Sequence, residues 1–171
     1  MAIFEIKAKH TVPIIQLERG SAIDAAELDE MRKHPDFQQY GCYVYSIAFP
    51  TGAMPIYVGK AQDQCFSSRT FSADNRLRVQ NSINDYQRKY PLAVWLVAQQ
   101  NNRGAPNKSE IDHIECWLIY KATERNPDGL LNKHRAGFNP HDLKIAHILT
   151  HIPPGRTPNL VVEFKNMMGL D

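Results

Sequence analysis

Glu115 is the residue whose position most needs a chemical explanation. Its neighbours at helical spacing, Ile111, Leu118 and Ile119, are apolar, so a helix would place this carboxylate on or beside its buried face. A buried carboxylate is costly unless a cation, an Arg or Lys partner or a bound proton offsets its charge. A hard divalent cation such as Mg²⁺ commonly rests on one or two carboxylates, with water and phosphate oxygens completing its shell. A carboxylate at the helix edge with its head in solvent is the other interpretation.

Two tyrosines stand in neighbouring runs that are typical of β-strands. Tyr43 belongs to the apolar run 42–49, and Tyr57 belongs to the run 56–61. The six residues between the runs, 50–55, are rich in turn-forming types. The pattern predicts a β-hairpin that presents both phenols from one small sheet.

The triplets Gly41-Cys42-Tyr43 and Tyr57-Val58-Gly59 resemble the two triplets that give the GIY-YIG nuclease family its name. The resemblance covers about residues 39 to 133. It extends to the helix of Glu115, which continues into Leu-Ile and is followed by a Pro-containing turn and an asparagine. The positions that match the family, in chain order, are Tyr43, Tyr57, Arg69, Glu115 and Asn132.

The resemblance implies a metal-dependent endonuclease that hydrolyses DNA phosphodiester bonds through one Mg²⁺ or Mn²⁺ ion held by Glu115. Tyr43 would help to activate the water, as a general base or through a hydrogen-bonded relay. A phenol has an ordinary pKa of about 10, so a base would need nearby positive charge, which Lys60 would supply. Tyr57 would orient the water or the phosphate. Gly59 would leave room for close approach of the backbone to the substrate.

Two of the matched positions have competitors. Arg69 would grip the scissile phosphate, because a planar guanidinium suits bidentate phosphate contact. Arg76 is the alternative, and it is also a candidate for wider substrate binding. Asn132 lies farther from Glu115 than in compact members of the family, so Asn126 remains an alternative to it.

Charge along the chain allows a polyanionic partner without requiring one. The net charge of +2 is too small to argue for nucleic acid by itself. Basic side chains gather in residues 69–89 and 133–144, whereas residues 18–36 are mainly acidic. The two basic segments would be able to face DNA, and an ordinary solvated surface is the other interpretation. A homodimer or an accessory protein would supply further contacts with DNA.

The elements that must position these residues predict a mixed α/β (α+β) domain. We expect a small three-stranded antiparallel sheet flanked by helices, with residues 39–133 as the nuclease core. Residues 1–38 form an N-terminal extension with an accessory helix, and residues 134–171 form a C-terminal extension packed on the core. The expected strands are 42–49, 56–61 and 92–98, and the expected helices are about 21–34, 63–71, 76–90, 109–123 and 140–150.

Composition fits one globular domain of 171 residues, with 43% hydrophobic residues. No run of eighteen apolar residues is present, and Glu5 interrupts the apolar start, so we expect a cytoplasmic protein without a membrane partner. The three cysteines form no CxxC pair and are expected to be reduced. Two other functions stay open: a non-catalytic nucleic-acid-binding module and a protein-interaction module that retain the fold.

Overall fold

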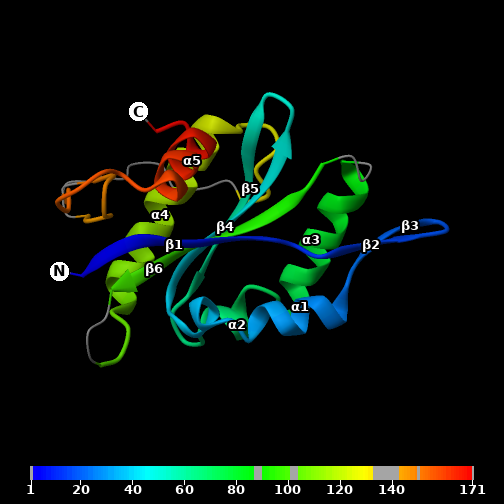
Figure 1. The fold of residues 1–171 in the computed structure, drawn as a ribbon, viewed down its shortest axis with the longest axis horizontal. Helices are drawn as coiled ribbons and strands as arrows, with labels where there is room; N and C mark the ends of the chain where they lie inside the picture. Colours follow the sequence, from blue (N-terminus) through cyan, green and yellow to red (C-terminus); the bar gives the residue numbers. More distant parts are fainter. Residues whose placement is uncertain (1, 87–89, 101–103, 133–142, 150, 171) are drawn as a thin grey trace.

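A four-stranded antiparallel sheet in the order β1-β6-β4-β5 forms the centre of the molecule (Figure 1). The hairpin of β4 (Gly41–Phe49) and β5 (Gly52–Ala61) contains both predicted runs, but β5 begins four residues before the expected start at residue 56, because residues 52–55 pair with β4 rather than forming a turn. β6 (Leu92–Gln100) pairs with β4, and β1 (Ile3–Thr11) pairs with β6. The antiparallel sheet and its three predicted strands are confirmed. This computed structural model describes residues 2–86, 90–100, 104–132, 143–149 and 151–170.

The fourth strand, β1, corrects the prediction of a three-stranded sheet. Its buried side chains are Phe4, Ile6 and Ala8, and a shift in the pairing with β6 falls between Ile6 and Ala8. The outer edge of β1 is partly covered, because Phe4 N donates to Lys144 O at 2.8 Å and Ala146 N donates to Phe4 O at 2.7 Å. The strand is therefore part of the core sheet.

Helices cover both faces of the sheet, giving three layers (Figure 1). Cys42 and Val44 of β4 pack in the apolar cluster of one face, with α4 and α5. Tyr43 and Tyr45 point to the opposite face, where they pack with α1, α2 and α3. Successive β4 side chains thus serve different layers, as the pleat of a strand requires. The helix bounds are α1 (Ala25–Arg32), α2 (Phe66–Arg69), α3 (Ala73–Asp85), α4 (Lys108–Arg125) and α5 (Asn159–Met168).

Several helix boundaries differ from those expected. Asp24 caps α1, accepting hydrogen bonds from the backbone of Ala26 and Glu27. The helix expected over 63–71 is limited to the single turn α2, and α3 begins three residues before the expected start at residue 76. The expected helix 140–150 lies partly outside the described residues, and residues 145–149 form a turn closed by a β-bridge.

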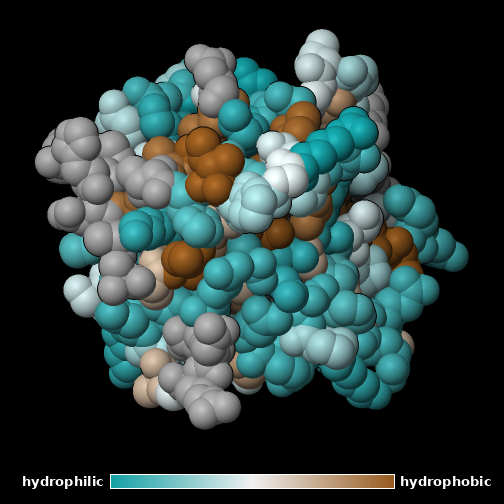
Figure 2. Space-filling view, turned by 60° about the vertical axis from the view of Figure 1, so that its left-hand side comes forward, coloured by the Kyte–Doolittle hydropathy of each residue, from teal (hydrophilic) through white to brown (hydrophobic). Residues whose placement is uncertain are grey.

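Two smaller features complete the fold. A short hairpin, β2 (Ile14–Leu17) with β3 (Gly20–Ile23), extends from the end of β1, and the single-turn 3-10 helix η1 (Pro35–Gln38) follows α1. Figure 2 shows one face of the molecule as mainly hydrophilic, with hydrophobic side chains in separate groups. Among the described helices, none has the length and apolarity that crossing a membrane requires.

Candidate functional site

The candidate site lies where β5 ends and the chain enters α2. A hollow of about 260 Å³ opens there. Lys60 and Arg69, two of the predicted site residues, both line it. Gln62, Asp63 and Gln64 complete its lining. Two cations beside one hollow make it suited to a phosphate group.

Lys60 connects this hollow to Glu115. Its ammonium lies 3.2 Å from Glu115 Oε2 and also pairs with the carboxylate of Asp112. Lys60 is the cross-strand partner of Cys42, whose side chain packs against α4, so Lys60 points to the same side. The Glu115 side chain is only 12% exposed. The charge of the mostly buried Glu115 carboxylate is therefore offset by a lysine partner.

The charges around Lys60 raise its pKa. Burial is the largest single influence and lowers the pKa, but the hydrogen bonds to Asp112 and Glu115 and the charges of both carboxylates together outweigh it. Lys60 is therefore a firmly charged ammonium at neutral pH. Two carboxylates and one ammonium leave this group with a formal charge of −1.

The donor set around Glu115 fits a hard divalent cation. Asp112 and Glu115 stand three residues apart on α4, so both carboxylates project from one face of the helix. Carboxylate oxygens are the ligands that Mg²⁺ and Mn²⁺ prefer, and the net negative charge favours a cation. Glu115 would be the principal ligand, because it is the less exposed of the two.

Tyr43 lies on the opposite face of the sheet and is fully buried. Its hydroxyl accepts a hydrogen bond from Asn75 Nδ2 at 2.7 Å. Burial, followed by the neighbouring Tyr57, raises the pKa of Tyr43, and the charge of Arg69 only partly opposes this rise. The direction is opposite to the one that a general base needs, and Lys60 points to the other layer. Tyr43 is a neutral phenol at pH 7.

Gly59 is required by Tyr43. The two residues are cross-strand partners, and a Cβ at position 59 would overlap the ring and hydroxyl of Tyr43. Gly41 is constrained in a similar way, because a Cβ there would overlap the carbonyl oxygen of Val97, and its φ of +150° disfavours other residues. The Tyr43 ring thus fills the space that the sequence analysis assigned to the substrate.

Tyr57 is half-buried and belongs to a cluster of aromatic rings. Its ring stacks on Tyr45 at 5.9 Å and lies 6.2 Å from the ring of Tyr43. The guanidinium of Arg78 sits 5.1 Å from its centre. Arg78 also donates to Asn75 Oδ1 at 2.8 Å, so Arg78, Asn75 and Tyr43 form one hydrogen-bonded chain.

Asn75, Arg78 and Asp112 are site neighbours that the sequence analysis did not select. Asn75 and Arg78 stand three residues apart on α3, a spacing that places them on one helix face. The expected start of this helix at residue 76 excluded Asn75. Asp112 was not considered as a site residue, although its spacing of three from Glu115 was a usable signal.

The two candidate arginines have different surroundings. Arg69 lines the hollow, and its charge acts on Tyr43. Arg76 donates from Nε to Phe71 O at 2.9 Å and lies 3.8 Å from the carboxylate of Asp29 on α1. These contacts direct Arg76 towards α1, whereas Arg78 takes the place beside Tyr57.

Asn132 and Asn126 both bind the free edge of β5. Asn132 donates from Nδ2 to Val58 O at 2.5 Å and accepts from Val58 N at 3.1 Å. Asn126 donates from Nδ2 to Pro55 O at 2.8 Å. The amides therefore act as a substitute for a neighbouring strand. Asn132 fixes the backbone between Tyr57 and Gly59 rather than presenting its own side chain to a ligand.

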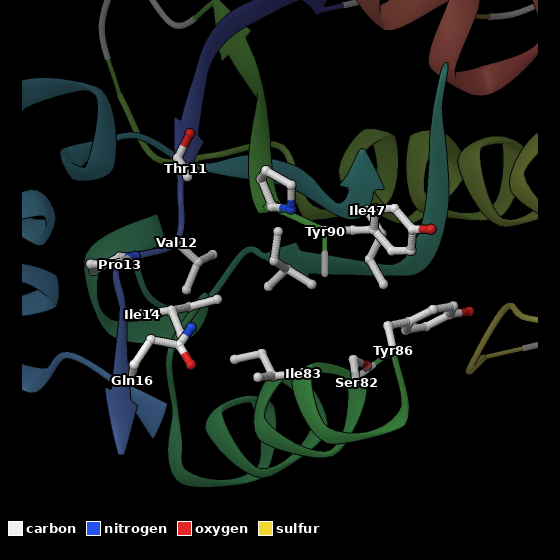
Figure 3. Close-up of a pocket in the computed structure, with 12 residues that line it drawn as sticks. Thr11, Val12, Pro13, Ile14, Gln16, Ile47, Ser82, Ile83, Tyr86 and Tyr90 are labelled. Carbon is white, nitrogen blue, oxygen red and sulfur yellow. The ribbon is translucent and has the colours of Figure 1, made fainter. Parts of the chain in front are cut away.

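A separate hollow of about 370 Å³ contains none of the predicted site residues. In Figure 3, Ser82 and Ile83 of α3, with Tyr86 at its C-terminal cap, lie across it from Val12 and Ile14. The lining is mainly apolar, and the lining residues that the structure describes include no charged side chain for a phosphate. The basic segment 133–144 also contributes nothing to the site description, because residues 133–142 lie outside the described residues.

Comparisons with known proteins find no matching family model, no matching curated protein and no matching solved structure. The site is therefore interpreted from its own geometry. Arg69, Lys60 and Glu115 follow one another across the end of β5, and Tyr43 and Tyr57 stand on the far face with Arg78 and Asn75.

Proposed function

We propose that this protein is a metal-dependent endonuclease that hydrolyses DNA phosphodiester bonds through a GIY-YIG-type site. The observation that carries the proposal is the position of Lys60. It shares a hollow with Arg69 and pairs with Glu115 and Asp112, so phosphate-binding cations and metal-binding carboxylates are adjacent. Phosphodiester hydrolysis needs both, because negative charge develops on the phosphate in the transition state.

Each residue then has a defined part. Arg69 binds the phosphate oxygens through its guanidinium, and Lys60 exchanges part of its carboxylate pairing for the phosphate. Glu115, supported by Asp112, would hold Mg²⁺ or Mn²⁺, and the ion would supply Lewis-acid activation of the phosphate. Because Tyr43 stays protonated and is fully buried, it supports the site through its hydrogen bond with Asn75 rather than acting as the base. Tyr57, held under Arg78, orients the water or the phosphate.

A non-catalytic nucleic-acid-binding module is the second candidate function. Two observations favour it: Lys60 already neutralises Glu115, and burial raises the pKa of Tyr43. A descendant that kept the fold but lost catalysis would retain such an ion pair for stability alone. The two functions differ in whether Glu115 is needed for chemistry.

Cleavage of supercoiled plasmid tests the proposal. Wild-type protein is incubated with plasmid and Mg²⁺, Mn²⁺ or EDTA, in parallel with Glu115→Gln. The matched control is Glu163→Gln, which alters an exposed glutamate of α5. Nicked or linear product that requires metal, persists in the control and disappears in Glu115→Gln supports the nuclease. Equal cutting by all three proteins, or binding of DNA without any cutting, contradicts it.

A further inference from the structure

His10, His34 and Asp36 form a second candidate site away from Glu115. His10 lies near the end of β1, His34 directly precedes η1, and Asp36 lies in its first turn. One ligand atom from each residue falls within 4.8 Å of the other two. Among the described residues, this is the only group of three or more His, Cys, Asp or Glu side chains that meets this condition.

Asp36 Oδ2 stands between the two imidazoles. It lies 3.5 Å from His10 Nε2 and 3.1 Å from His34 Nδ1. Ligands of a tetrahedral zinc ion, each 2.0–2.1 Å from the metal, are separated by about 3.3 Å. The two nitrogen-to-oxygen distances are therefore close to the distance between two ligand atoms of a tetrahedral zinc site.

His10 has an unused nitrogen aimed into this group. Its Nε2 atom is buried and makes no hydrogen bond within the part of the chain that the structure describes. The neutral form of an imidazole carries a lone pair that can bind a metal, so this nitrogen is available as a ligand atom. The Phe37 ring packs 4.8 Å from the His10 ring and limits its rotation.

We propose that His10, His34 and Asp36 bind one divalent transition-metal ion of the zinc class. Two imidazole nitrogens with one carboxylate are a ligand set of three-residue zinc sites, in which water takes the fourth position. Nitrogen ligands disfavour Mg²⁺ and Ca²⁺, which prefer oxygen. The site is therefore chemically distinct from the carboxylate pair around Glu115.

Solvent reaches the site from the side of His34, whose side chain is 53% exposed. An ion can therefore reach His34 from solvent without opening the sheet. His34 Nδ1 also accepts a hydrogen bond of 3.3 Å from the Asp36 backbone, which metal ligation through this atom would replace. The bound ion would tie β1 to the segment between α1 and η1, two elements that precede the predicted nuclease residues.

Cobalt absorption and calorimetry test this site without any activity assay. The full-length protein is freed of metal with a chelator and titrated with Zn²⁺, or with Co²⁺, whose visible bands report coordination. We expect one ion per chain in the wild type, and a dissociation constant at least about 100-fold higher for His34→Ala, since loss of a supporting partner alone costs 10–100-fold. Asp36→Asn gives a second, nearly isosteric variant. His113→Ala, at an exposed position of α4, is the control and should bind as the wild type does.

Three results would overturn the proposal. One is failure of the folded wild type to bind Zn²⁺ or Co²⁺ in a 1:1 ratio at micromolar concentration. Another is equal affinity in wild type, His34→Ala and Asp36→Asn. The third is a thiolate-to-cobalt charge-transfer band, which would place the ion on a cysteine. Circular dichroism of each variant confirms that a loss of binding is not a loss of folding.

Discussion

At the scale of single residues, the glycines of the two matched triplets are explained by packing in the sheet. Gly59 makes room for the ring of Tyr43, and Gly41 makes room for the carbonyl oxygen of Val97. The glycines of both triplets are therefore needed for the packing of the hairpin. The case for catalysis depends instead on Lys60, which shares one hollow with Arg69 and pairs with Glu115.

Gly59→Ala should lower the free energy of unfolding by about 1–3 kcal/mol, because the new methyl group overlaps the Tyr43 ring. Urea denaturation at pH 7 measures the loss. A double-mutant cycle with Tyr43→Leu isolates the cause, since leucine does not extend to the position of the phenol hydroxyl. The cost of Gly59→Ala should be smaller in that background, and an equal cost in both backgrounds would refute the explanation.

Burial should keep Tyr43 and Tyr45 protonated well above pH 10 in the folded protein, because it raises the pKa of both phenols. A folded-state pKa above the unfolded value means that stability is retained below pH of about 10 and falls as the pH rises further. Phenolate absorbance between pH 8 and 11 measures this. In the folded protein, Tyr43→Phe should leave the rise in phenolate absorbance over this pH range unchanged.

In urea, Tyr43→Phe should reduce the rise in phenolate absorbance by about one seventh. The reason is that all seven tyrosines titrate in the unfolded chain. A smaller rise in phenolate absorbance in the folded Tyr43→Phe variant would show that Tyr43 ionises near pH 10 in the folded wild type. That result would contradict the account of Tyr43 as a phenol whose pKa is raised by burial.

The sequence predicted which residues belong to the site more completely than it predicted the contacts that these residues make. Tyr43, Arg69, Lys60 and Glu115 were selected from the sequence, but the alternation of a strand sends Tyr43 and Lys60 to opposite faces. The proposed effect of Lys60 on Tyr43 overlooked this alternation. Asn75 and Arg78 escaped selection because their role depends on how α3 packs on the sheet, which spacing within the helix does not determine.

At the scale of secondary-structure elements, the edge of β5 is held by side-chain amides. Asn126, Leu131 and Asn132 supply the hydrogen bonds that a fifth strand would otherwise make: Leu131 N donates to Ile56 O at 2.8 Å, between the two asparagine contacts. An exposed strand edge is prone to pairing with other chains, and this segment covers it. The same segment fixes the end of β5, where Lys60 projects.

Asn132→Ala should destabilise the protein by about 1–3 kcal/mol, since it leaves the N–H and C=O of Val58 without their partner. Hydrogen exchange at the Val58 amide should accelerate. Leu131→Ala is the control, because its side chain is 51% exposed and its backbone bond is retained. Unchanged stability and unchanged Val58 protection in Asn132→Ala would contradict this role.

Elements with strong patterns could be predicted from sequence, and those with short or mixed patterns could not. The apolar runs of β4, β5 and β6 predicted these strands, whereas α1 begins at Ala25, four residues after the expected start at residue 21. β1 also carries a period-two signal in Phe4, Ile6 and Ala8, but these residues were considered only as a possible signal region. Residues 160–164 form an apolar run too short to distinguish helix from strand, and the structure places them within α5.

At the scale of the whole molecule, the segments outside the resemblance contribute to the same fold as the site. Residues 1–38 supply β1 to the sheet, and residues 134–171 supply α5 to the apolar cluster beneath α4. The three layers place the carboxylates on one face and the tyrosines on the other. The end of β5, where Lys60 and Arg69 line one hollow, is where the proposed substrate phosphate would meet the carboxylates.

The most direct test of this account is to measure binding and single-turnover cleavage of one labelled DNA duplex on the same samples of wild type and Glu115→Gln. Removing a charge that stabilises the transition state commonly costs 10²–10³ in rate. The account predicts that Glu115→Gln binds the duplex within about threefold of wild type and cleaves it at least about 100-fold more slowly. Equal cleavage rates, or a wild type that binds the duplex and cuts it with neither Mg²⁺ nor Mn²⁺, would contradict the account.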